Sequence, residues 1–218
     1  MLISTAHRLI FIHVPKTGGT SVAEALAPVG TGAGFGAGAA LRRALPGRLD
    51  PGTAWFQMHD PARLVRAKLG PEVWQSYRSF AFVRHPYAHA RSHYAYIQTY
   101  RYRRWQQIAK ALSFESFLRW RLAGPPHWAK SRTGLFARLP DQAWFLTDGE
   151  GRVIVDRVGR FERLAEDLAE ICADAGLPAP ALPHLRAGSG AGPEISDEAK
   201  ALVQRLYARD FELFGYER

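Results

Sequence analysis

The feature that most constrains the fold is a short apolar run that leads through a glycine-containing turn directly into a helical segment. Residues 8–14 (RLIFIHV) are mostly β-branched, aliphatic or aromatic and end at Pro15, which predicts a buried strand. Residues 20–29 then place apolar side chains on one helical face. A second run, residues 79–85 (SFAFVRH), predicts another strand, and Pro86 opens another helix. This alternation predicts an α/β fold with a mostly parallel central sheet flanked by helices.

The rest of the chain continues this pattern. Asp60 and Ser196 precede helix-forming runs and are expected to be N-caps. Asp148–Gly149 is a favourable turn dipeptide and predicts that residues 143–156 form two strands joined by that turn. Further helices are expected at residues 61–70, 87–102, 114–122, 162–176 and 197–215, and loops at 30–52, 124–134 and 177–193. With no internal repeat and no long linker, residues 1–218 are expected to form a single domain.

Composition excludes several classes of protein. The 218 residues are 47% hydrophobic and 22% charged, which is typical of a globular domain that needs no disulfide framework. The single cysteine, Cys172, excludes an internal disulfide and a thiolate zinc cluster, and favours a reducing compartment. No run reaches the roughly 18 apolar residues of a membrane span. The first residues make a poor signal peptide, so we expect a cytoplasmic protein without a membrane anchor.

Charge is distributed unevenly along the chain. The formal net charge is +9, but residues 1–140 carry a net +15 and residues 141–218 a net −6. Residues 73–114 contain seven Lys or Arg and no carboxylate. A solvated surface usually mixes charges of both signs, so this excess predicts an anionic ligand. Nucleic acid, an acidic polysaccharide or a nucleotide with several phosphates would each satisfy it.

The strongest local motif is HVPKTGGTS, residues 13–21, between the first strand and the first helix. The first amides of a helix lack internal acceptors and carry partial positive charge, so this junction is suited to bind phosphate or sulfate. Glycines let the backbone approach the anion, hydroxyls add donors and a lysine adds charge. The alternative is a plain turn with Thr20 as the N-cap. The motif is not a Walker A loop, because its lysine precedes the glycines.

A second motif, residues 80–94 (FAFVRHPYAHARSHY), places Arg84 at the carboxyl end of a strand and Ser92 on the helix that follows. Ligands of open α/β sheets bind beyond the carboxyl ends of strands, so Arg84 and Ser92 are predicted to bind one further anionic group. The alternative is that Arg84 is a structural ion-pair partner, which the acid-free surroundings disfavour.

Together the two motifs resemble family 2 of the sulfotransferase superfamily, the branch that acts on carbohydrates. PKTGGTS looks like the 5′-phosphosulfate loop of this family, and RHPYAHARS matches its 3′-phosphate motif, an Arg and a Ser separated by seven residues. Residues 140–168 (PDQAWFLTDGEGRVIVDRVGRFERLAEDL) are similar to the family's segment of a glutamine, a hairpin, "GRFE" and a helix. Residues 207–217 resemble its terminal helix. Matching is weak at residues 30–55 and 97–135.

This resemblance implies a P-loop-NTPase-like sulfotransferase fold and a specific donor, 3′-phosphoadenosine-5′-phosphosulfate (PAPS). The partners implied are PAPS, its product 3′,5′-ADP (PAP) and a hydroxyl-bearing acceptor, a carbohydrate or glycolipid, with no nucleic acid and no metal. Arg84 and Ser92 would bind the 3′-phosphate, and Arg186 with Ser189 would belong to a late loop that closes over the nucleotide. The residues implied to hold the 5′-phosphosulfate are Lys16, Thr17, Gly18, Gly19, Thr20 and Ser21.

Two catalytic residues are expected. Lys16 would stabilise the negative charge that develops on the leaving 5′-phosphate. His59 is the leading candidate for the base that deprotonates the acceptor hydroxyl, because some members of the family carry a catalytic histidine at this position. The alternatives are that His59 is structural, with Asp60 orienting it or capping the helix, and that Glu24 is the base.

The remaining histidines and aromatic residues allow weaker predictions. His85, His89 and His93 recur at helical spacing, and we prefer a helix face that lines an anionic acceptor groove to a zinc site, which needs a further ligand. Trp128, in a loop, is the aromatic residue most suited to stack on a sugar ring.

Two other classes of function remain open. One is a Mg²⁺-dependent kinase or ATPase on the same α/β plan, which the missing Walker lysine disfavours. The other is a non-catalytic protein that binds a polyanion through its basic half, with an affinity that falls steeply with salt.

Overall fold

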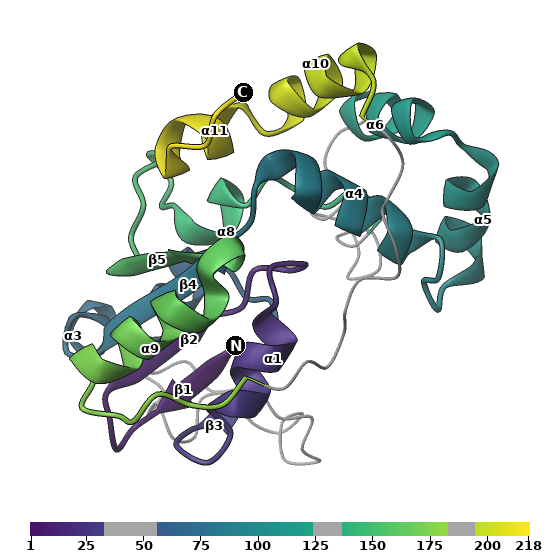
Figure 1. Cartoon of the computed structure of the whole chain (residues 1–218). Helices are drawn as coiled ribbons and strands as arrows, with labels where there is room; N and C mark the ends of the chain where they lie inside the picture. The colour runs from purple at the N-terminus through teal and green to yellow at the C-terminus, as the bar shows by residue number, and fades with distance from the viewer. Residues whose placement is uncertain (33–55, 124–136, 183–194) are drawn as a thin grey trace. The chain divides into compact units, whose positions relative to one another are not determined.

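A computed structural model describes residues 1–32, 56–123, 137–182 and 195–218 (Figure 1). The chain divides into two compact units. The first contains Met1–Val83 and Trp144–Arg186, and the second contains Arg84–Ala143 and Ala187–Arg218. Because each unit is assembled from two separate stretches, no single cut in the sequence separates them.

The first unit is built around a five-stranded sheet of order β3-β1-β2-β4-β5. The three strands β2, β4 and β5 are parallel, with Ile12 paired to Ala81 and Val83 to Arg160. The short strands β1 and β3 extend the β2 edge in antiparallel pairing. The strands are β1 (Leu2–Ser4), β2 (Leu9–Ile12), β3 (Thr31–Gly32), β4 (Arg78–Val83) and β5 (Arg157–Arg160). The predicted α/β fold with a mostly parallel central sheet is confirmed.

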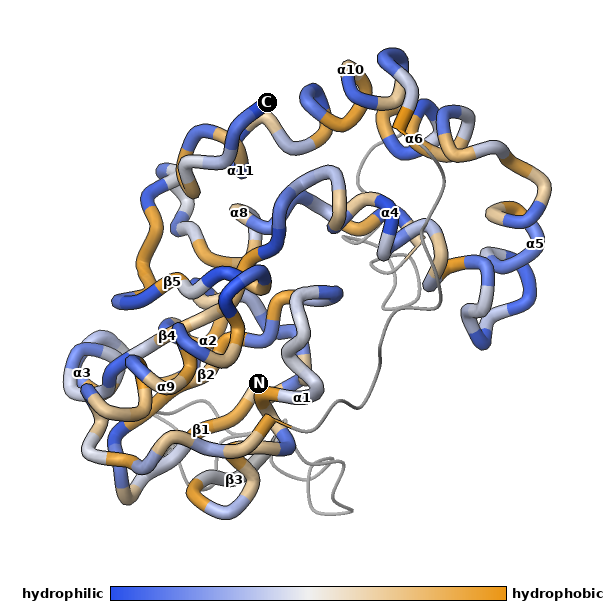
Figure 2. The backbone as a smooth tube through the Cα atoms, viewed as in Figure 1, coloured by the Kyte–Doolittle hydropathy of each residue, from blue (hydrophilic) through white to orange (hydrophobic). Residues whose placement is uncertain are grey.

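Helices cover this sheet because its strands are apolar on both faces. On one face, Phe11 and Phe82 pack into a core with residues of α1 (Gly19–Ala25) and α9 (Leu164–Asp174). Ile10 and Ile12 alternate with Phe11, point to the other face and are also fully buried. Figure 2 shows the hydrophobic colour along β1 and β2. The other helices of this unit are α2 (Ala62–Leu69), α3 (Pro71–Gln75) and a 3₁₀ turn, η4 (Phe161–Arg163).

Parallel pairing places the carboxyl ends of β2, β4 and β5 at one edge of the sheet. The chain continues from β2 into the loop 13–18, and from β5 into η4. The loop with the strongest sequence motif therefore begins at the edge where ligands of α/β sheets bind.

The second unit is helical. Its α10 (Asp197–Leu206) packs against α6 (Phe114–Leu122) and α4 (Pro86–Ile97). Rings fill its interior, with Phe117 between Tyr94 and Trp120 at centroid distances of 5.2 and 5.8 Å. Its remaining helices are α5 (Arg103–Ala111) and α11 (Ala208–Phe214).

The prediction of two strands at residues 143–156 is wrong. Ala143–Leu146 form a short helix, α8, and the only β-pairing described within this segment is one bridge between Thr147 and Val153. The predicted turn at Asp148–Gly149 is confirmed, because the Asp148 carboxylate accepts the amide protons of Glu150 and Arg152. The helix forms because Asp210 accepts the amide proton of Ala143, its first residue.

Several element boundaries also differ from the prediction. The helix that begins at Pro86 ends at Ile97, five residues earlier than expected, and the C-terminal helix breaks at Tyr207 into α10 and α11. The helix at 114–122 and the N-cap Ser196, which accepts the Ala199 amide proton, are confirmed. Strand β1 and helix α5 were not expected.

Candidate functional site

The loop 13–18 has an unusual backbone. Lys16 has φ +69° and Gly18 has φ +78°, so a non-glycine residue adopts the left-handed conformation. Such strain is typical of functional sites, although it does not define a function. Gly18 is the N-cap of α1, and among the described residues no side chain caps this helix. The alternative in which Thr20 is the N-cap is therefore wrong. The Ser21 amide donates to the Gly18 carbonyl, so the amides suited to an external acceptor are those that precede it.

Buried side chains hold the loop in this shape. The Thr17 side chain is fully buried and its hydroxyl donates a hydrogen bond to the Val14 carbonyl at 2.9 Å, so a contact from Thr17 to an anion would be made by its amide. A Cβ atom on Gly18 would lie 2.9 Å from Leu164 and 3.0 Å from Phe161. The phenylalanine of the GRFE motif thus packs against the loop glycine.

His59 is bound directly to the start of this loop. Its Nδ1 lies 2.8 Å from the carbonyl oxygen of His13. A carbonyl only accepts hydrogen bonds, so Nδ1 carries the proton and Nε2 keeps the lone pair of the neutral ring. Burial lowers the pKa of His59 to about 4, the bond to His13 opposes this shift, and the positive charges of the N-terminus and of Lys16 add to it. His59 is therefore neutral at pH 7, with a basic nitrogen at Nε2.

His13 is a structural residue of the site. Its ring stacks on Phe11 at 5.6 Å and meets the His59 ring edge-on at 4.5 Å. A Cβ atom on Gly19 would lie 2.1 Å from the His13 ring, so the ring packs against the first residue of α1. Burial lowers the pKa of His13 well below its usual value, because the charged form would be desolvated. His13 thus joins β2, the loop and His59 in one packed group.

Asp60 is not the N-cap of the helix, so that prediction is wrong, and none of its described hydrogen bonds goes to His59. Its buried carboxylate accepts hydrogen bonds from the Gln57 amide and from the Lys68 ammonium group. The N-cap of α2 is Pro61, one residue later. Asp60 instead closes the turn that presents His59 and ties it to α2.

Arg84 is held through its main chain in the second unit. The Gln142 side-chain amide accepts the Arg84 amide proton at 2.7 Å and donates to the Arg84 carbonyl at 2.8 Å. The Asp210 carboxylate in turn accepts from the same Gln142 amide group at 2.9 Å. Ser92 lies half-buried on α4. The sequence pointed to Gln142 only as the glutamine of the family-like segment, without a role, and it did not point to Asp210. Their connection to Arg84 could not be predicted because the two residues lie 58 and 126 positions from it in the chain.

The predicted histidine face is wrong for two of its three residues, while His85 is half-buried and stacks on Tyr87. His89 and His93 are fully buried rather than lining a groove. His89 lies 3.0 Å from the Tyr207 hydroxyl, and His93 packs on Phe117. The described parts of the chain contain no group of three or more His, Cys, Asp or Glu suited to a metal ion. The zinc alternative gains no support.

The last of the predicted residues are those of the late loop, the loop tryptophan and the rival base. Arg186, Ser189 and Trp128 lie outside the described residues. Glu24 is exposed on α1, as expected of a solvent-facing residue.

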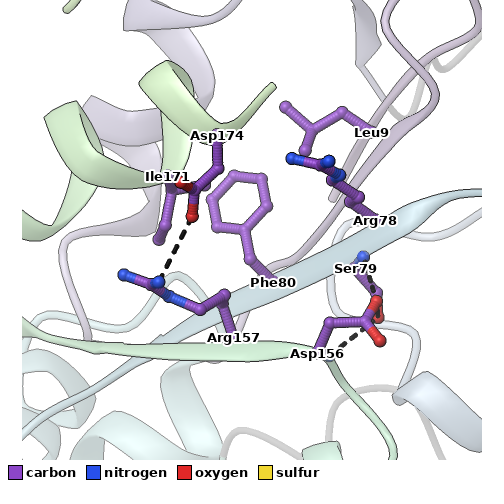
Figure 3. A pocket seen from close by; sticks show the side chains of 8 residues that line it. All are labelled: Leu9, Arg78, Ser79, Phe80, Asp156, Arg157, Ile171 and Asp174. Carbon is purple, nitrogen blue, oxygen red and sulfur yellow. Dashed lines mark hydrogen bonds and ion pairs between the residues drawn. The ribbon is translucent and has the colours of Figure 1, made fainter. Parts of the chain in front are cut away.

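A cavity of about 310 Å³ lies elsewhere in the first unit (Figure 3). Leu9, Arg78 and Arg157 line it and are the first residues of the three parallel strands, so it opens at the edge opposite the loop 13–18. Arg157 is paired with Asp174 at its rim. None of the predicted site residues lines this cavity.

The sheet, the loop at its carboxyl edge and the first turn of α1 define an α/β protein suited to bind an anionic group. The model of the sulfotransferase family matches residues 1–217, and the chain belongs to this family, whose chemistry is sulfuryl transfer. An uncharacterized protein of Archaeoglobus fulgidus is 30% identical over 118 residues, which cover 54% of this chain and 83% of that protein. No solved structure matches. Among the described residues, no helix combines the length and apolar character needed to cross a bilayer.

Proposed function

We propose that the protein transfers a sulfuryl group from PAPS to a hydroxyl group of a carbohydrate or glycolipid, with His59 as the base. The observation that carries this proposal is the bond between His59 Nδ1 and the His13 carbonyl. It joins a neutral histidine, with a lone pair on Nε2, to the first residue of the loop proposed to bind the anion. A base beside such a loop is what transfer of an anionic group to an alcohol requires.

The loop would compensate charge on the donor. The first amides of α1 and the Lys16 ammonium group would face the 5′-phosphosulfate, with Gly18 and Gly19 allowing a close approach. When the bond from sulfur to the bridging oxygen breaks, its electron pair stays with the 5′-phosphate, and Lys16 would stabilise that charge. Thr17 would contribute its amide, and Thr20 and Ser21 their hydroxyls.

His59 would accept the proton of the acceptor hydroxyl at Nε2 while the new bond from oxygen to sulfur forms. The His13 carbonyl favours the imidazolium that results, because it accepts the Nδ1 proton throughout. Arg84 and Ser92 would bind the 3′-phosphate, and Arg186 with Ser189 would close over the nucleotide. None of these roles requires a metal ion. The carbohydrate acceptor and the cytoplasmic location stay predictions.

A nucleotide comparison tests the donor. Thermal shifts are measured with 3′,5′-ADP, ADP and ATP without added Mg²⁺. We expect selective stabilisation by 3′,5′-ADP, of about 2.7 kcal/mol at a hundredfold excess over its Kd. The Arg84→Met variant should lose this selectivity. Equal shifts with all three nucleotides would contradict the proposal, and a shift with ATP that requires Mg²⁺ would favour the kinase alternative.

Turnover of PAPS with a panel of sugar acceptors tests the two catalytic residues. His59→Ala should lower the rate by about 10²–10⁴ and Lys16→Ala by about 10²–10³. Glu24→Gln is the matched control for the rival base and should leave turnover unchanged. A folded His59→Ala variant with full turnover at pH 7 would remove His59 from the reaction. Absence of turnover in the wild type, with salt-sensitive polyanion binding that Lys16→Ala leaves almost intact, would favour the non-catalytic alternative.

A further inference from the structure

The segment that carries Arg84 lies beyond the end of the sheet ladder. Pairing of β4 with β5 ends at Val83 opposite Arg160, so Arg84 is the first residue past the last ladder pair. Beyond this pair, the side chain of Gln142 rather than strand β5 bonds to the main chain of β4's continuation. Its amide accepts from the Arg84 N–H at 2.7 Å and donates to the Arg84 carbonyl at 2.8 Å. One side chain thus makes the two hydrogen bonds that a neighbouring strand would make.

The orientation of the Gln142 amide is fixed by its partners. The Arg84 N–H requires an acceptor, and the Asp210 carboxylate, 2.9 Å from Nε2, requires a donor. If Oε1 and Nε2 of Gln142 exchanged places, both of these contacts and the bond to the Arg84 carbonyl would be lost. Gln142 and Asp210 are both fully buried, so no water competes for these bonds.

Asp210 is itself held firmly by the main chain around Gln142. It accepts the amide protons of Gln142 at 3.0 Å and of Ala143 at 2.8 Å. The residues that precede Gln142 and Asp210 in the chain, Asp141 and Arg209, form an ion pair with two hydrogen bonds, both of 2.9 Å. The segment 141–143 is therefore fastened to the start of α11, and Gln142 has a rigid base from which to hold Arg84.

We infer that Gln142, oriented by Asp210, is a positioning residue that fixes the main chain of Arg84 and so directs its guanidinium toward the 3′-phosphate of the nucleotide. This inference rests on the proposed function. A guanidinium binds phosphate through two parallel bonds, which tolerate little change in direction. If the main chain of Arg84 were mobile, the affinity for the 3′-phosphate would therefore fall more than the affinity for the rest of the nucleotide.

The readout is the ratio of the Kd for 5′-AMP to the Kd for 3′,5′-ADP, measured by calorimetry. The two ligands differ only in the 3′-phosphate, and any loss of folded protein cancels in their ratio. Charge-assisted hydrogen bonds of about 3 kcal/mol in total correspond to a wild-type ratio of about 100. Gln142→Ala should lower the ratio about tenfold, toward the value near one expected of Arg84→Met.

Two further variants keep the test independent of folding. Gln142→Glu preserves shape but replaces the donor to Arg84 and Asp210 by an oxygen, and it should lower the ratio like Gln142→Ala. Asp156→Ala is the matched control, because Asp156 also accepts a β4 amide proton, that of Ser79, at the opposite end of the strand. It should leave the ratio at the wild-type value even where it lowers the melting temperature.

The outcomes distinguish a failure of the proposed function from a failure of the role inferred for Gln142 alone. A wild-type ratio near one would refute the role of Arg84 in the proposed function, and the inference with it. A wild-type ratio near 100 that folded Gln142→Ala and Gln142→Glu variants both retain would overturn the inference and leave the proposed function standing. If Asp156→Ala lowered the ratio as much as Gln142→Ala does, the inference would likewise be overturned, because loss of any main-chain bond of β4 would then have the same effect as loss of the Gln142 bonds to Arg84.

Discussion

Replacing Gly19 by alanine tests how the loop, His13 and His59 are packed together. The added Cβ would lie 2.1 Å from Cδ2 and 2.4 Å from Nε2 of His13. These distances are far below van der Waals contact, so either the ring or the start of α1 must move. The His13 ring has little room, because it is buried between Phe11 at 5.6 Å and His59 at 4.5 Å.

The net effect of Gly19→Ala follows from two opposing terms. Overpacking a filled site costs about 1–3 kcal/mol. Alanine in place of glycine in a helix returns at most about 1 kcal/mol, and less at the first position of α1. We therefore expect a loss of about 1–2 kcal/mol in the free energy of unfolding, which for a chain of this length lowers Tm by about 2–8 °C. Because His13 holds His59 through its carbonyl, turnover should fall as well.

Gly149→Ala is the matched control, since a Cβ there would meet nothing within 4 Å. Both variants are compared with the wild type by urea unfolding and by turnover at pH 7. We expect Gly149→Ala to be neutral in both measurements. If Gly19→Ala unfolds at the same urea concentration as the wild type and turns over normally, the ring of His13 does not fill the space beside Gly19 and the packing argument fails.

Two further predictions concern pH and the other end of β4. Because His59 must be neutral to act as a base and its pKa is lowered to about 4 in the free protein, kcat/KM for PAPS, which reports the free enzyme, should rise with pH through about 4 and stay level to pH 8. An acid limb near 6.5 in kcat/KM for PAPS that disappears in His59→Ala would contradict the burial of the free-enzyme base. Asp156→Ala removes the acceptor for both the Ser79 amide and the Ser79 hydroxyl, each at 2.7 Å, and should cost about 1–3 kcal/mol in urea unfolding; an unchanged unfolding midpoint would show that these bonds add nothing to the start of the β4–β5 pairing.

The sequence was most informative where local chemistry decides structure. The first strand, its glycine turn and the first helix occupy consecutive residues, so apolar patterning and the conformational freedom of Gly18 were enough to predict them. The helix at 114–122 is likewise set by its own cap, Ser113, and by its apolar face. His59 could be proposed from its position in the chain, but its tautomer could not, because this depends on the carbonyl of a residue 46 positions away.

Long-range contacts explain the predictions that failed. The segment at 143 has the β-rich pattern of a strand, but Asp210, 67 residues later, accepts its first amide proton and starts a helix instead. His89 and His93 have the spacing of a binding face, but Tyr207 and Phe117 cover them. In each case a buried polar or aromatic partner from a distant segment outweighs the local preference.

A histidine with a pKa near 4 is a weak base in the free protein, and the causes of that pKa explain why it remains suited to the proposed reaction. Burial is the main cause of the lowering, the N-terminal ammonium group adds to it, and the positive charge of Lys16 makes a smaller contribution. An anion bound to Lys16 would offset this charge and add its own attraction for a proton on His59. Two unit charges about 4 Å apart interact by about 4 kcal/mol at the effective dielectric of a protein surface, which corresponds to about three pKa units. The loop proposed to bind the donor would therefore also strengthen the base, so His59 would gain proton affinity only when a sulfuryl group is present to be transferred.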